Sequence, residues 1–173
     1  MIIEAIRILD DAVRDATIGL AVQLAAVPKE SGDSTPSTPT IYNEVQHGEA
    51  ARDAFPDGVG PYLLIASQSL EDAQPLVRPI QDFRVGVAFR YMIRDADTEV
   101  AIRTASYTWR ALNRTLGLLF TTSAGLTLRT RNQVGLYTMN TMQGGILSAP
   151  VNDTPLSWAL TYSCTLRDTW ANT

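Results

Sequence analysis

Cys164 and His47 are the one thiol and the one imidazole of the chain, and they are the first candidates for nucleophilic or metal chemistry. One cysteine excludes an intrachain disulfide, and the two residues together are too few for a thiolate–imidazole metal cluster. Cys164 falls on the apolar side of an alternating segment, where burial raises the pKa of a thiol and lowers its reactivity. His47 stands beside Gly48 in a polar stretch and is expected to face solvent or a partner. We therefore predict no Cys–His nucleophile.

Asp95, Asp97 and Glu99 alternate as the first acids of a calcium-binding loop do. Such a loop has glycine at its sixth position and glutamate at its twelfth, and this chain has Val100 and Ser106 there. Acids also precede helices, because negative charge is stabilised by the positive end of a helix. We interpret the run as the start of a helix, and predict no metal site.

Two glycine-containing stretches, 58–61 and 144–145, lack the lysine and the strand-to-helix setting of a phosphate-binding loop. Asp10 and Asp11 are adjacent on an expected helix, so their side chains point about 100° apart and do not converge as an acid–base pair. Glu71 and Asp72 form a second adjacent pair. We find no convergent catalytic set, and predict that the protein is not an enzyme and uses no cofactor.

The composition is that of one globular domain covering 1–173, with 45% hydrophobic and 18% charged residues. The formal net charge of −4 argues against a dedicated nucleic-acid binder, which needs a basic face. No run of 18 apolar residues exists, so we expect no contact with a membrane. The first residues carry acids where a signal peptide carries bases, so no export signal is expected.

The segment 2–27 has apolar residues at alternating spacings of three and four and predicts one amphipathic helix that stops before Pro28. The segment 28–61 differs sharply, with five of the nine prolines and four of the eleven glycines. We interpret it as a long loop inserted after the helix, with a short strand at 40–45 and a helical turn at 49–54.

The rest of the chain alternates between expected strands and one further helix. Strands are predicted at 62–67, 83–93, 126–130, 134–142 and 156–167, with a polar connection at 68–82, a helix at 97–120 and a turn-rich stretch at 143–154. The inner stripe of that helix is Ala101, Ala105, Thr108, Leu112, Leu116 and Leu119. The two longest strands, 83–93 and 156–167, are expected to pair at the centre of the sheet. The order predicts an α+β fold: an antiparallel or mixed sheet with two helices packed on one face.

The arginines are candidates for a surface that binds another protein rather than for catalysis. In each of three groups the arginines are predicted to lie on one face of a strand or helix: Arg84 and Arg90; Arg129 and Arg131; Arg103, Arg110 and Arg114. They form either a solvated surface or a basic side that docks against an acidic side of another copy. The acidic side consists of Glu4, Asp11 and Asp15. Contacts between unlike surfaces of identical copies close into rings.

The order of elements resembles the tail terminator family of long-tailed bacteriophages, which includes the lambda tail terminator. The resemblance is carried by the helix at 2–27, the strand DFRVGV at 82–87, the helix ending in LNRTL at 112–116, and PLSWALTY at 155–162 after a polar loop. It covers 2–27 and about 62–170. The family has no residue motif that fixes a functional side chain, so no residue role is carried over.

The resemblance implies an α+β subunit of a homo-oligomeric ring, a hexamer in that family. Such a ring caps the tail tube, stops its polymerisation, and joins the tail to the neck of the head. The implied partners are other copies of the chain, the major tail tube protein and a head stopper or neck protein, with DNA only passing through the lumen. The implied location is the tail–neck junction of the virion, after assembly in the host cytoplasm. From the charge we expect a negative lumen wall along which DNA slides.

Two other functions remain open from the sequence. One is another head–tail connector component: a head stopper, a tail completion protein or a tube protein. The other is a small enzyme or binding domain that uses the 28–61 loop as a lid.

Overall fold

The computed structural model describes residues 2–48, 61–73, 80–94, 97–130, 134–143 and 156–169. Its sheet has five strands in the order β1-β2-β3-β5-β4. The strands are β1 (Thr40–Asn43), β2 (Tyr62–Ala73), β3 (Ile80–Ile93), β4 (Val134–Gln143) and β5 (Leu156–Thr169). β1 pairs with β2 in parallel and the other three pairings are antiparallel, so the sheet is mixed and the fold is α+β, as predicted.

The two longest strands pair at the centre of the sheet, as predicted. β3 and β5 are antiparallel over their full lengths, from Ile80 opposite Thr169 to Ile93 opposite Leu156. Alternate residues of both strands are buried, because one face of the sheet carries the core. The inward residues of the two strands are Phe83, Val85, Val87, Phe89, Tyr91, Ile93, Leu156, Trp158, Leu160, Tyr162, Cys164 and Leu166.

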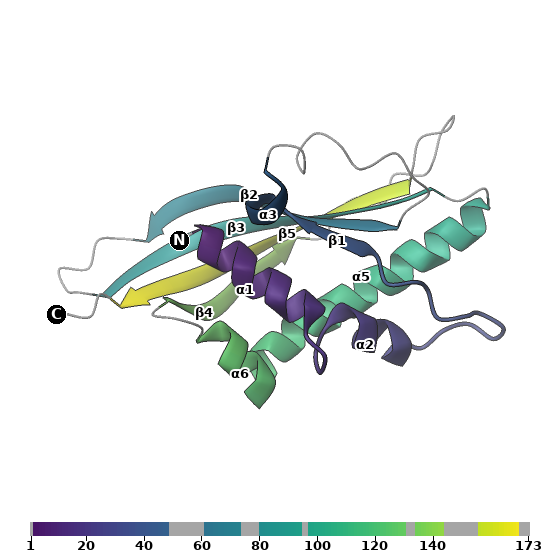
Figure 1. Ribbon diagram of the computed structural model, residues 1–173, viewed down its shortest axis with the longest axis horizontal. Coiled ribbons are helices and arrows are strands. Elements are labelled where there is room, and N and C mark those ends of the chain that lie inside the picture. The colour runs from purple at the N-terminus through teal and green to yellow at the C-terminus, as the bar shows by residue number, and fades with distance from the viewer. Residues whose placement is uncertain are drawn as a thin grey trace.

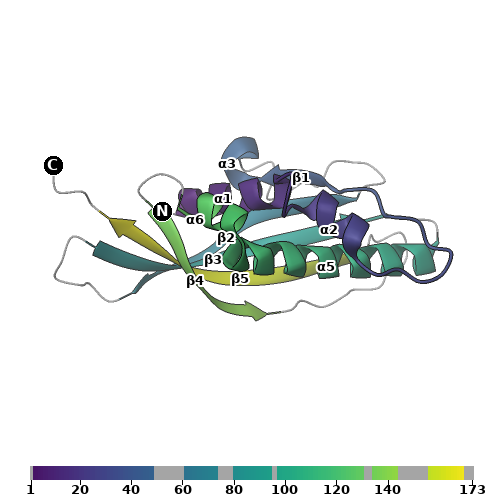
Figure 2. The same ribbon diagram turned by 90° about the horizontal axis from the view of Figure 1, so that it is seen from below.

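The described residues hold five helices where the sequence predicted two long ones. They are α1 (Ile2–Arg14), α2 (Leu20–Ala26), α3 (Glu44–His47), α5 (Thr98–Thr121) and α6 (Ser123–Arg129). Figures 1 and 2 show α1 lying across the sheet and α5 running beside the long strands. Buried residues of α1, α2 and α5 join the inward residues of β3 and β5 in one apolar cluster. No helix of the described chain has the length and hydrophobicity needed to cross a membrane.

Trp158 connects α5 to the sheet. Its indole Nε1 donates to the carbonyl oxygen of Ala105 at 3.1 Å. Its ring stacks on Tyr91 of the neighbouring strand, and meets Trp109 of α5 edge to face, each with centroids 5.0 Å apart. A buried indole needs such a polar partner, so this contact sets where α5 sits over β3 and β5.

The single helix predicted at 2–27 is wrong. α1 ends at Arg14, and the Asp15 carboxylate accepts the N–H groups of Thr17 at 2.7 Å and Ile18 at 2.9 Å. A Cβ at Gly19 would lie 2.2 Å from the carbonyl oxygen of Asp15, so the chain turns where only glycine fits. The short aspartate side chain competes with the helical hydrogen bonds, and α2 begins afresh at Leu20.

The strand predicted at 126–130 is also wrong, since these residues lie in or just after α6. Thr122 caps α6 by accepting the N–H of Gly125 at 3.1 Å, and its own N–H donates to Leu118 at the end of α5. Arg129 is therefore helical and shares no strand face with Arg131, which lies outside the described residues.

The short strand predicted at 62–67 continues through the expected polar connection to Ala73. Its register against β3 shifts between Ser67 and Ser69, and β3 itself begins at Ile80. The predicted strand at 40–45 is β1 followed directly by α3. The helical turn predicted at 49–54 lies outside the described residues, as do residues 144–154 of the stretch predicted to be rich in turns.

Candidate interaction surfaces

The candidates for catalysis lie on separate elements. Cys164 is buried on β5, and burial raises the pKa of its thiol to about 12. His47 ends α3, where its Nδ1 lies 3.0 Å from the carbonyl oxygen of Asn43 and its ring meets Tyr42 edge to face. Among the described residues, no group of three or more His, Cys, Asp or Glu side chains is placed to hold a metal ion.

The acidic run before α5 forms a helix cap in its described part. Asp97 Oδ1 accepts the N–H groups of Glu99 at 2.9 Å and Val100 at 3.3 Å. This is the geometry of an N-terminal cap, in which a carboxylate satisfies helical N–H groups that lack a backbone partner. Asp95 lies outside the described residues.

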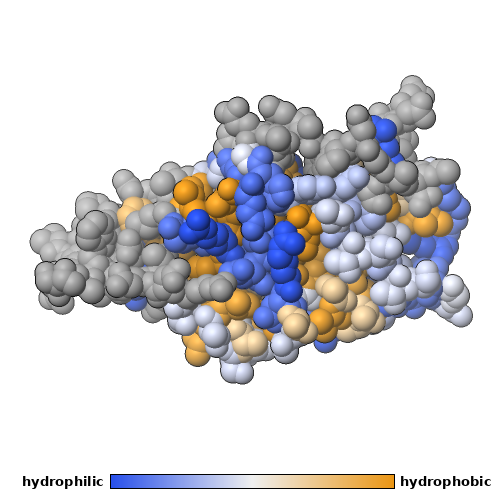
Figure 3. Space-filling model, viewed as in Figure 1, coloured by the Kyte–Doolittle hydropathy of each residue, from blue (hydrophilic) through white to orange (hydrophobic). Residues whose placement is uncertain are grey.

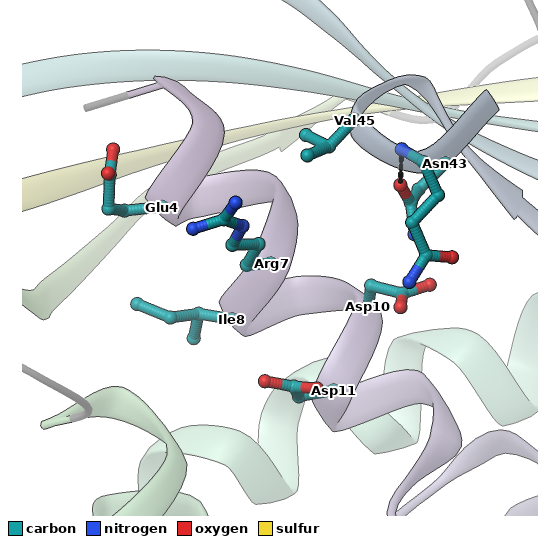
Figure 4. A pocket seen from close by; sticks show the side chains of 8 residues that line it. Glu4, Arg7, Ile8, Asp10, Asp11, Asn43 and Val45 are labelled. Atoms are coloured by element: carbon teal, nitrogen blue, oxygen red, sulfur yellow. Dashed lines mark hydrogen bonds between the residues drawn. The ribbon is translucent and has the colours of Figure 1, made fainter. Parts of the chain in front are cut away.

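Glu4 and Asp11, two of the three predicted acidic residues, line a hollow of about 430 Å³. We call it the α1–α3 hollow, because Glu4, Arg7, Ile8, Asp10 and Asp11 come from α1 and Asn43, Val45 and Gln46 from the end of β1 and from α3. Figure 4 shows Glu4, Ile8 and Asp11 projecting to one side of α1, and Asp10 projecting to the other side, toward Asn43. Figure 3, which has the viewpoint of Figure 1, shows a band of hydrophilic residues that runs between apolar patches on this face of the molecule.

The wall of the hollow is held by an ion pair within α1. Asp10 is only 5% exposed, and both its carboxylate oxygens lie 3.0 Å from Nε of Arg14. Arg14 also donates to the carbonyl oxygen of Ile41 in β1 at 2.9 Å. The charge of Asp10 is thus matched internally. Asp15, the third predicted acid, caps the turn after α1, so its carboxylate has a structural role.

Arg103 on α5 was predicted to form a basic helix face with Arg110 and Arg114, but its guanidinium binds the segment after α2. Its Nη1 lies 2.9 Å from Asp33 Oδ1 and 3.7 Å from Glu30, and its Nη2 pairs with Glu99 one turn earlier. The hydroxyl of Tyr107 donates to Asp33 Oδ2 at 2.6 Å. We call Asp33, Arg103 and Tyr107 the loop clasp, since they fasten the segment after α2 to α5.

Arg129 is also used internally. Its Nε donates to the carbonyl oxygen of Leu119 at 2.8 Å, and its guanidinium lies 4.9 Å from the centre of the Phe120 ring. The side chain therefore ties α6 back onto the end of α5, combining a hydrogen bond with a cation–π contact.

Arg110 and Arg114 are exposed one turn apart on α5, and neither forms an ion pair with a described residue. We call this pair the α5 arginine ridge. Arg110 also borders a shallow groove shared with Ile102, Ser106 and the 28–30 segment. Ile102, on the same helix, is 41% exposed. Positive charge beside exposed apolar surface is a composition suited to contact with another macromolecule.

Arg84 and Arg90 lie on the sheet face that turns away from the core, and both are exposed. On the same face, Asp82 accepts two hydrogen bonds from Arg167 of β5, at 2.8 and 3.0 Å. The neighbouring outward residues of β5 include Thr161, Ser163 and Thr165. Toward β2 the same face carries a second, small apolar cluster of Leu64 and Ala66 with Tyr42, so the face is polar only in part.

Sequence reasoning missed the loop clasp and a second long-range contact. Glu44 of α3 accepts both the N–H and the hydroxyl of Ser67 at 2.7 Å, which fixes α3 against the irregular point of β2. Partners separated by 23 and by 74 positions leave no periodic signal, so only the fold brings them together. No family model and no curated protein sequence matches this chain.

Proposed function

We propose that this protein is a structural subunit that assembles head to tail with copies of itself into a ring, a hexamer by the resemblance, at the end of a phage tail tube. The ring stops growth of the tube and joins the tail to the neck of the head, with DNA passing through its lumen. The observation that carries the proposal is a charge asymmetry: the α1–α3 hollow carries Glu4 and Asp11, and the α5 arginine ridge carries Arg110 and Arg114.

Unlike surfaces on one chain favour a heterologous contact. In a two-fold dimer residue i meets residue j and j meets i within one shared patch, so the ridge and the hollow would both have to lie in that one patch. Docking the ridge of one copy into the hollow of the next instead pairs opposite charges, and repetition of that contact closes a ring. Arg7 within the hollow offsets part of the acidic charge, so exposed apolar side chains such as Ile102 contribute as well.

The elements behind the resemblance to tail terminators also support the proposal. The DFRVGV segment lies in β3 and PLSWALTY contributes to β5, so the two segments meet in the central strand pair. The LNRTL segment lies in α5, and its Arg114 belongs to the ridge. These segments build one body, in which the sheet and α5 hold the ridge rigidly.

The first test measures assembly. We expect the purified protein to form rings by light scattering and electron microscopy, and to bind one end of purified tail tubes. Arg110→Glu with Arg114→Glu should leave the protein folded but monomeric. Arg90→Glu with Arg94→Glu is the matched control, because it makes the same change of charge at two exposed arginines near the end of β3 and should still assemble. A protein that stays monomeric and ignores tube ends contradicts the proposal. Repeated rings along the tube would identify a tube protein instead.

Complementation tests which surfaces meet. The variant Glu4→Lys with Asp11→Lys carries a basic hollow and a basic ridge, and the variant Arg110→Glu with Arg114→Glu carries an acidic hollow and an acidic ridge. Each alone should repel itself. Their equimolar mixture should recover rings of alternating variants, because both contacts then pair opposite charges. Failure of the mixture, with both variants folded, contradicts docking of ridge into hollow.

A further inference from the structure

The sheet leaves two long backbone edges without a partner strand among the described residues. β1 pairs only with the first part of β2, from Tyr62 to Ile65. Glu44 takes the N–H of Ser67, and no described strand pairs with the outer side of residues 68–73. β4 forms the opposite edge over Val134–Gln143. An unpaired edge presents N–H and C=O groups that bind another strand.

The sequence of β4 lacks two features that usually protect an edge strand from pairing with another chain. Its ten residues, VGLYTMNTMQ, include no charged residue and no proline. Monomeric proteins interrupt such an edge with charges or proline, or cover it, to prevent association. The register of β4 on β5 shifts at two points. Such irregularities bend a strand and increase its twist, which suits a sheet that continues around an axis.

The strand directions make the two edges compatible. β2, β3, β5 and β4 are successively antiparallel, so β4 runs opposite to β2. In a ring whose axis lies near the strand direction, rotation preserves the direction of each strand. β4 of one copy therefore meets β2 of the next copy in antiparallel orientation. The ten residues of β4 are long enough to cover the six residues of 68–73.

α3 and α6 lie toward opposite edges of the sheet. α3 contacts β1 and β2, α6 contacts β4 and α5, and α1 crosses between them, contacting β2, β3, β4 and α6. Figure 1 shows β2 with α3 along the upper margin and β4 with α6 along the lower one. Joining β4 to the next β2 would thus bring α6 of one copy toward α3 of its neighbour, which is the part of the α1–α3 hollow that lies at the β2 edge.

We propose that β4 of one copy adds to residues 68–73 of β2 in a second copy, so that the sheets of neighbouring subunits form one continuous sheet. The inference rests on the self-association proposed above and specifies its main contact. Backbone hydrogen bonds supply the affinity in such strand addition.

Hydrogen exchange provides the first test. Amides of 68–73 and 134–143 should exchange about tenfold or more slowly in assembled protein than in protein diluted to monomers, because pairing removes them from solvent. Amides in the middle of α5 are the internal control and should exchange equally in both states. Rings that show no protection of β4 overturn the inference and leave the ring proposal intact.

Disulfide trapping provides a second test with its own control. Gln68→Cys or Ser69→Cys, both exposed positions of β2, is mixed with single cysteines at positions 138–141 of β4. Neighbouring positions alternate between faces, so the scan samples both faces and several registers. Oxidation of the mixture should give covalent dimers, whereas Thr17→Cys, exposed on the turn after α1, should give none with β4. Assembled rings without any β2–β4 disulfide overturn strand addition. A chain that is monomeric under every condition overturns the ring proposal and this inference together.

Discussion

The hydroxyl of Tyr107 on α5 donates a hydrogen bond of 2.6 Å to Asp33, 74 positions earlier in the chain. The same hydroxyl oxygen accepts the N–H of Glu30 at 3.1 Å, and Arg103 lies 2.9 Å from the other oxygen of Asp33. These bonds give a defined course to a segment without helix or strand. They place residues 28–30 beside Arg110, at the border of the α5 arginine ridge.

The loop clasp should make stability depend on acid pH. The Tyr107 hydrogen bond, followed by Arg103, lowers the pKa of Asp33 below its ordinary 3.8. The clasp therefore stabilises the fold fully above pH 3.8 and loses its effect as the pH falls through the lowered value. Tyr107→Phe should lower the free energy of unfolding at pH 7. The difference in this free energy between the variant and the natural protein should shrink below pH 3.8. Urea unfolding measures both, with Tyr42→Phe as control. An equal difference at both pH values contradicts the clasp.

The ion pair between Asp82 and Arg167 should contribute measurably because it is bidentate. Two parallel bonds of 2.8 and 3.0 Å join directly opposed residues of β3 and β5. A double-mutant cycle with Asp82→Asn and Arg167→Gln should give a coupling of about 1 kcal/mol, reduced by salt. Arg167→Lys should lose much of it, because an ammonium cannot form the forked contact. Additive effects within error would show that the pair contributes nothing.

The central strands could be predicted because a strand with one buried face has apolar residues at alternate positions. Phe83 to Ile93 and Leu156 to Leu166 alternate so regularly that their strands, faces and mutual pairing were all correct. The buried stripe of α5 was correct for the same reason, from Ala101 to Leu119. A long periodic pattern averages over many residues, so local exceptions do not change it.

Two of the errors arose where one side chain binds nearby backbone. Asp15 and Thr122 each accept N–H groups two or three positions ahead, which ended one expected helix and started an unexpected one. The candidate surfaces show a related limit. The spacing predicted Arg103 and Arg110 on the same exposed side of α5. Only the fold shows that Arg103 forms an ion pair with Asp33, whereas Arg110 has no ion-pair partner among the described residues.

Two glycines should respond in opposite directions to replacement by alanine. A Cβ at Gly117 in α5 meets nothing within 4 Å, so Gly117→Ala should stabilise the protein by about 0.5 to 1 kcal/mol through reduced backbone entropy. A Cβ at Gly19 would lie 2.2 Å from the backbone of Asp15, so Gly19→Ala should destabilise by about 1 to 3 kcal/mol. Thermal and urea unfolding measure both variants. Equal effects would contradict the break between α1 and α2.

The thiol of Cys164 should not react with thiol reagents in the native protein. Burial raises its pKa from 9.0 to about 12, so at a given pH the folded chain holds far less thiolate than the unfolded chain. A maleimide or disulfide reagent should label it only on unfolding, whereas Thr17→Cys provides an exposed thiol that reacts at once. Because the unfolded thiol ionises first, Cys164 should also make stability decline as the pH rises above 9.0. Native labelling of Cys164 as fast as that of the exposed control would contradict this burial and reopen a chemical role for the residue.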